Sequence, residues 1–158
     1  MDIQVPPGVR GGRHGIILFN FSSSEFAAPG GVQIKGELGT IFLLEIALTQ
    51  TRKGAISDFL IAKGNEGATF SAIFHNKGNV LIKASGSVII RDDSNKVVDR
   101  LPLNGGTGTI LPEGKRNFTG KWNNRRKLSP GKYFAEVRML FPGNSEVLKV
   151  QRDFLFSK

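Results

Sequence analysis

The chain has 158 residues and a formal charge of +9, with 39% hydrophobic and 22% charged residues. This composition fits one globular core or slightly more, and it excludes a disordered or fibrous chain. Because the chain has no Cys and only two His, disulfides and thiolate chemistry are excluded, and most hydrolytic and metal chemistry is disfavoured. We therefore predict no cofactor, no metal site and no small-molecule substrate.

The first predicted elements are two segments that are apolar on both faces, residues 13–21 and 32–48. Such segments are typical of central strands that are covered on both sides. The run Ile41–Leu48 also fits one face of a helix, but its short length and the preceding Gly36 and Gly39 favour a strand. Two such strands are unstable alone, so we predict self-association through them, as a dimer or an open filament. The interface residues predicted for this association are Ile17, Phe19, Phe21, Ile41 and Leu43.

Residues 68–74 alternate apolar and polar side chains with the period of two that marks a half-buried strand. The turn-forming cluster Asn76–Asn79 follows and includes a glycine, which tolerates positive φ. The sequence therefore predicts that the chain reverses there and that Val80–Ala84 pairs with residues 68–74 as a hairpin.

A second hairpin is predicted from Ser87 to Leu101. The cluster Asp92–Asn95 separates two strand-forming segments, and its side chains can bond their own backbone to form a turn. Calcium binding is disfavoured at these acids, because the central Gly and terminal Glu of an EF-hand loop are missing.

Three further strands are predicted at residues 116–122, 131–142 and 145–156. Trp122, at the end of the first, is expected to pack against the core or to cap one end of it. Tyr133 lies at the start of the penultimate strand, which is the position of a tyrosine corner in immunoglobulin-like sandwiches.

Counted from Ile56, the predicted strands number about seven or eight in roughly 100 residues, the size of an immunoglobulin-like β-sandwich. The predicted fold class is therefore all-β, with this sandwich preceded by two or three strands of an incomplete one.

Several motifs in order resemble a known group of proteins: Asn76–Val80, Gly86–Ile90, Ile110–Gly114, Trp122 and Leu128–Tyr133. Together they resemble the C-terminal immunoglobulin-like domain of prokaryotic secreted and surface proteins related to the WxL-associated surface proteins. The resemblance covers residues 56–157 and implies a non-catalytic adhesive or structural module, located outside the cell or on its surface. In that group a membrane anchor often follows, and no anchor lies within this sequence.

Residues 5–19 have loosely the same form as residues 128–141: a Pro-Gly turn, a ring side chain, and a strand that ends in Leu-Phe. The resemblance therefore implies that residues 1–55 are the last strands of a preceding tandem sandwich, and that residues 56–158 form a complete second one. In this interpretation the first sandwich is a natural truncation, a processed product or an engineered fragment.

The positive charge is concentrated in the second part of the chain, where the segment from Lys115 to Lys132 holds seven basic residues and no acid. One interpretation is a solvated strand edge that discourages pairing between molecules. The other is a contact for an anionic polymer, nucleic acid or cell-wall polysaccharide, with Phe118 and Trp122 as stacking surfaces. The residues predicted for this contact are Lys115, Arg116, Lys121, Trp122, Arg125, Arg126 and Lys127.

No enzyme is predicted, because neither His14 nor His75 is accompanied by a nucleophile motif or paired carboxylates. The glycine-rich segment 104–109 also lacks the Gly-Lys-Ser/Thr ending of a phosphate-binding loop. We therefore favour an extracellular structural or adhesive module that contacts another protein or a second copy, with polymer binding as the alternative.

Overall fold

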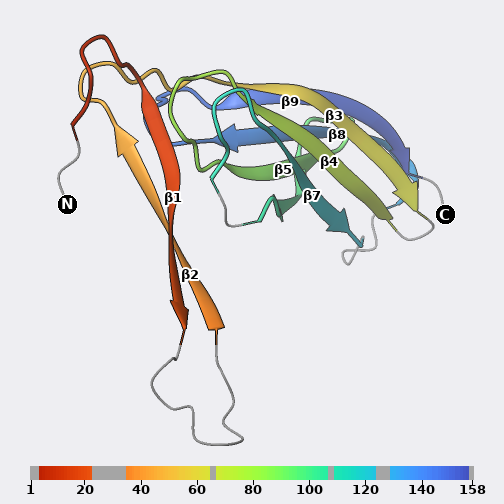
Figure 1. Cartoon of the computed structure of the whole chain (residues 1–158). Coiled ribbons are helices and arrows are strands. Elements are labelled where there is room, and N and C mark those ends of the chain that lie inside the picture. The colour runs from red at the N-terminus through yellow and green to blue at the C-terminus, as the bar shows by residue number, and fades with distance from the viewer. Residues whose placement is uncertain (1–3, 23–34, 65–66, 107–108, 124–128, 157–158) are drawn as a thin grey trace, which may run out of the picture. The chain divides into compact units, whose positions relative to one another are not determined.

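The computed structural model describes residues 4–22, 35–64, 67–106, 109–123 and 129–156. The chain divides into two compact units, Met1–Thr49 and Gln50–Lys158. Every regular element in the described residues is a β-strand of an antiparallel sheet, which confirms the predicted all-β class (Figure 1). Across the same residues, no helix reaches the length and apolar character that a membrane span requires.

The first unit contains a two-stranded antiparallel sheet, β1 (Gly12–Ser22) and β2 (Lys35–Glu45). The register runs from Gly12 opposite Glu45 to Ser22 opposite Lys35 without a bulge. The strand predicted in the run from Ile41 is confirmed, although it ends at Glu45, before the turn in which Leu48 has a positive φ of 61°. That these strands belong to an incomplete sandwich stays a prediction.

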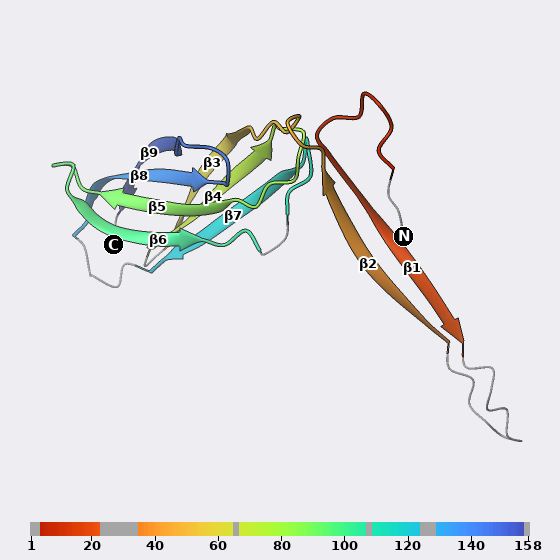
Figure 2. The same ribbon diagram turned by 90° about the vertical axis from the view of Figure 1, so that its left-hand side faces the viewer.

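The second unit is a sandwich of two sheets (Figure 2). One sheet has the order β3-β4-β7 and the other the order β6-β5-β8-β9. The strands are β3 (Gly54–Gly64), β4 (Gly67–Asn76), β5 (Ser85–Arg91), β6 (Val97–Leu103), β7 (Lys115–Trp122), β8 (Gly131–Leu140) and β9 (Leu148–Phe156).

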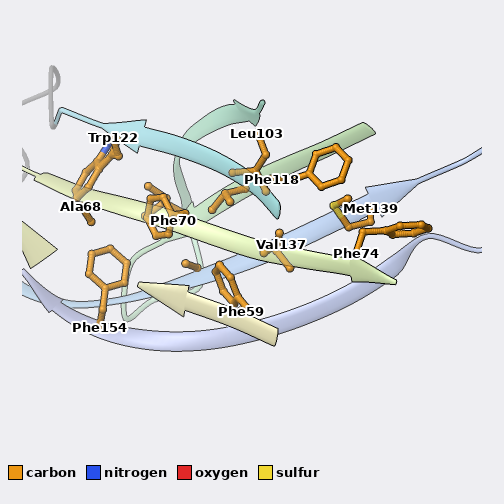
Figure 3. Packing of buried hydrophobic residues seen from close by; sticks show 14 of the residues in the cluster. Phe59, Ala68, Phe70, Phe74, Leu103, Phe118, Trp122, Val137, Met139 and Phe154 are labelled. Carbon is orange, nitrogen blue, oxygen red and sulfur yellow. The ribbon is translucent and has the colours of Figure 1, made fainter. Parts of the chain in front are cut away.

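The core of the sandwich is made by the alternating residues of facing strands (Figure 3). On β4, Phe70 and Phe74 are fully buried, and on β8 Val137 and Met139 are fully buried. Phe70 packs between Phe59 and Phe154, with ring centroids 6.3 and 5.9 Å away. Burial of each such aromatic or aliphatic side chain contributes roughly 1.5–3 kcal/mol to the free energy of folding. The apolar side chains that recur at every second residue of the strands therefore stabilise the sandwich.

The prediction that residues 68–74 and 80–84 form a hairpin is wrong. β4 pairs with β3 and β7, and from residues 80–84 only Ile82 forms a ladder contact, a single bridge to Ile110. The turn after β4 instead carries the chain into the opposite sheet. The buried Asn76 side chain fixes this crossing, because its Nδ2 donates to the carbonyls of Val80 and Ile110 at 2.8 and 2.9 Å.

The second predicted hairpin is confirmed, with β5 and β6 joined by the turn at residues 92–95. The Asp92 carboxylate accepts hydrogen bonds from the Ser94 hydroxyl at 2.7 Å and the Lys96 amide at 2.9 Å. The bond from Ser94 is the main reason that the pKa of Asp92 lies below its ordinary value. Asn95 completes the turn with a φ of 65°, a conformation that Asn tolerates better than most residues.

Candidate functional site

The β1–β2 hairpin exposes apolar side chains on both of its faces. Because residues directly opposite in an antiparallel pair share a face, the register assigns each side chain to one of two sets. The first face carries Ile16, Leu18, Ile41 and Leu43, and the second carries Ile17, Phe19, Phe21, Leu38, Phe42 and Leu44. Ile16 is 61% exposed and Ile41 69% exposed although they lie opposite each other at the centre of the sheet.

On the second face, aromatic rings lie over glycines of the neighbouring strand. Phe42 covers Gly15, and a Cβ atom added to Gly15 would stand 2.5 Å from the ring. Phe21 covers Gly36 in the same way at the other end of the hairpin. Such pairs compensate for the missing side chain of a strand glycine and keep the register fixed.

The outer edges of the hairpin have no neighbouring strand among the described residues. The amide of Ile46 donates to the carbonyl of Gly11 at 2.9 Å, just before the first ladder pair of the strands. Hydrogen-bonded pairs alternate with non-bonded ones in an antiparallel ladder, so the backbone groups of every second residue point outward. On β2 the central residues that point outward are Glu37, Gly39, Ile41 and Leu43.

The four edge strands of the sandwich are β3, β7, β6 and β9, and each carries a feature that discourages strand addition. β7 carries three basic side chains. β3 has a register shift between Ile56 and Asp58, and β6 contains Pro102. β9 carries charged side chains, including Arg152, whose Nη2 lies 3.7 Å from the Asp58 carboxylate. Bulges, prolines and charges all discourage strand addition, whereas six consecutive residues of β2, 39–44, carry no charge. The hairpin is therefore the surface best suited to pair with another strand.

The five predicted interface residues all lie on this hairpin, but not on one face. Ile17, Phe19 and Phe21 share the second face, and Ile41 and Leu43 share the first. Ile17 is half-buried, whereas Ile16, Leu18 and Leu38 are exposed. Sequence reasoning missed these three residues, because it assumed that strands apolar on both faces would be covered. The alternation along each strand already separates the two sets.

The predicted basic segment is divided by the geometry of β7. Lys115 and Lys121 point out of the sandwich, whereas Phe118 and Trp122 point into the core and are only 2% and 4% exposed. The predicted stacking role of Phe118 and Trp122 is therefore wrong, because neither ring is accessible to a base or sugar. The Arg116 side chain is half-buried, and its guanidinium donates to the Thr109 carbonyl at 3.0 Å.

A second surface retains some of the predicted basic character. Lys121 and Lys63 line a hollow of about 630 Å³ at the end of β3 and the start of β4, together with Thr69 and Asn123. Lys63 was missed because it lies far from Lys121 in the sequence. The predicted residues Arg125, Arg126 and Lys127 lie outside the described residues.

Several titratable side chains in the described residues form ion pairs. His75 Nε2 lies 3.3 Å from the Glu113 carboxylate on the outside of the sandwich, and His14 is exposed on β1. No group of three His, Asp or Glu side chains in this part of the chain is arranged to hold a metal ion.

Comparison with models of known protein families gives no match, and a search of curated protein sequences gives none either. The function therefore has to be inferred from the geometry of the chain.

Proposed function

We propose that the chain is a non-catalytic structural or adhesive module that acts outside the cell through protein–protein contact, by adding strands to the β1–β2 hairpin. The observation that carries this proposal is the exposure of apolar side chains on both faces of a sheet whose outer edges are unpaired among the described residues. Isolated two-stranded sheets are marginal in water, and apolar edges recruit strands that can pair with them. Association would satisfy the backbone groups of an edge and extend the sheet.

We propose further that the sandwich is immunoglobulin-like. Its division into sheets of three and four strands supports this, and so does the hydrogen bond from the Tyr133 hydroxyl to the Ser129 carbonyl, 2.7 Å long, at the start of the penultimate strand. Trp122 departs from the antibody pattern, because it lies at the end of β7 and the chain has no Cys pair for it to cover. In this proposal, the sandwich is the rigid body and the hairpin makes the contact. The location outside the cell rests on the resemblance to WxL-associated surface proteins.

The proposal is tested by placing a charge on the hairpin. Ile41→Lys puts a cation on its first face, and Leu60→Lys, at a side chain 51% exposed on the sandwich, is the matched control. Light scattering coupled to size exclusion should give a mass above that of the monomer for the parent chain and for Leu60→Lys. Ile41→Lys should lower that mass, because a charge on the edge strand opposes pairing. Equal masses for the two variants would contradict the proposal.

A second candidate function is binding of an anionic polymer, and the hollow that contains Lys63 and Lys121 favours it. Two lysines that line one hollow suit phosphate or carboxylate groups along a chain. Lys63→Ala with Lys121→Ala should then lower the salt concentration at which the protein leaves heparin, and Lys115→Ala, at the other end of β7, should change it less. The rest of the predicted segment is tested by replacing Arg125, Arg126 and Lys127 together by Ala. This change should reduce the slope of log binding constant against log salt concentration by up to about three.

A further inference from the structure

We infer that the strand added to the hairpin is β2 of a second copy of the same chain, so that two hairpins join into a four-stranded sheet of order β1-β2-β2-β1. This inference rests on the proposed function and names the partner. An isologous contact of this kind uses one edge twice, related by a two-fold axis, and it closes as a dimer.

The backbone of β2 is self-complementary in its full-length register. If two copies of Lys35–Glu45 pair antiparallel over their whole length, Thr40 of one copy lies opposite Thr40 of the other. Glu37 then pairs with Leu43, and Gly39 with Ile41. These are the residues whose N–H and C=O groups point away from β1, so each outward group meets an outward group.

The side chains of β2 favour the same register. Lys35 of each copy lies opposite Glu45 of the other, which gives opposite charges at both ends of the new ladder. Leu38 lies opposite Phe42 twice, and the two Thr40 side chains meet at the axis. Opposite charges, apolar pairs and Thr–Thr pairs are the cross-strand combinations that stabilise antiparallel sheets. A shift to the neighbouring register, centred on Ile41, would bring Glu37 opposite Glu45 and shorten the ladder.

The edge of β1 lacks this complementarity. In a full-length pairing of two β1 strands, Arg13 would lie opposite Phe21, and His14 opposite Asn20. β1 contains basic residues and no acid, so no opposite charges meet in any such register. The charges therefore favour β2 as the shared edge.

Cysteine cross-linking tests the assignment, because the chain has no Cys of its own. Opposed residues of a non-hydrogen-bonded pair have Cα atoms about 4.5 Å apart, within the range that a disulfide spans. Thr40→Cys should therefore give a covalent dimer on mild oxidation. Ile17→Cys is the matched control, since Ile17 lies opposite Thr40 on β1 and on the same face, and it should stay monomeric on a denaturing gel.

Charge exchange tests the register. Lys35→Glu and Glu45→Lys each place like charges opposite each other at both ends, and each should raise the dimer dissociation constant about tenfold or more at low salt. The double variant Lys35→Glu with Glu45→Lys restores opposite charges and should recover most of the affinity. Failure of the double variant to recover would overturn the proposed register.

The outcomes separate this inference from the proposed function. Cross-linking through Ile17→Cys instead of Thr40→Cys, or growth into ever larger species, would overturn the shared β2 edge while strand addition to the hairpin would stand. A parent chain that stays monomeric at every concentration, with hairpin amides that exchange rapidly throughout, would overturn both.

Discussion

Trp122 Nε1 donates a hydrogen bond of 2.9 Å to Asp99 Oδ2, which connects β7 of one sheet with β6 of the other. The indole ring also packs against Phe154 and Phe156, with centroids 6.0 and 5.5 Å away. The polar atom of a nearly buried Trp is thereby satisfied. This bond explains how an aromatic residue inside a basic segment belongs to the core and not to a binding surface.

Asp99→Ala should lower the free energy of unfolding by about 1–3 kcal/mol, because it leaves the Trp122 N–H without its acceptor. Urea unfolding followed by fluorescence measures this change, since Trp122 is the chain's single Trp. Asp93→Ala, in the exposed turn before β6, is the control and should change stability little. Equal stability of the two variants would show that the indole bond contributes nothing.

Asn76→Ala should destabilise the sandwich by about 3 kcal/mol, since it removes partners from three buried backbone groups. Its side chain donates to Val80 and Ile110 and accepts from the Gly78 amide at 2.9 Å. Lys77→Ala, at the exposed next position, should have little effect. Thermal unfolding of both variants checks the prediction, and similar midpoints would contradict the role given to Asn76.

Phe70→Ala should lower the free energy of unfolding by about 3–5 kcal/mol, because it opens a cavity between the two sheets. Ser71→Ala, one residue away, removes only an exposed hydrogen bond to Asn117 and should be nearly neutral. Denaturant unfolding of the pair measures how strictly the period of two separates core from surface. A large effect of Ser71→Ala would be inconsistent with the assigned faces.

The pKa of Tyr133 is raised above its ordinary value of about 10, chiefly because burial disfavours the phenolate, and the Asp92 and Asp93 carboxylates raise it further. Because the pKa of Tyr133 is higher in the folded than in the unfolded state, the protonated phenol contributes to stability. This contribution is complete below about pH 10 and is lost as the pH rises through the folded-state pKa. Tyr133 is the single Tyr, so phenolate absorbance reports its titration directly. Tyr133→Phe should flatten the alkaline loss of stability, and an unchanged alkaline profile would contradict this account.

The strands of the sandwich could largely be predicted from the sequence, because their signals are local. Alternation along residues 131–140 and the turn cluster at residues 92–95 define β8 and the β5–β6 hairpin. The path after β4 could not be predicted in this way. A turn signal at Asn76–Asn79 specifies where the chain bends, but the sheet it enters depends on the distant carbonyl of Ile110.

The candidate surfaces were predicted less well, for a related reason. The basic residues within Lys115–Lys121 lie close together in the sequence, but a strand sends successive side chains to opposite faces. Arg116 is therefore separated from Lys121, and Lys121 is joined by Lys63 from another strand. The apolar hairpin was found because its signal, hydrophobicity on both faces, is itself local.

Hydrogen exchange of the full chain, followed by mass spectrometry across about a hundredfold range of concentration, tests the central claim most directly. If the hairpin adds strands from another chain, protection of the amides that point outward on β2, such as those of Gly39 and Ile41, should increase with concentration. Amides of the sandwich core, such as that of Val137, should stay equally protected throughout. Hairpin amides whose exchange does not depend on concentration, in a particle that light scattering finds monomeric, would contradict the claim.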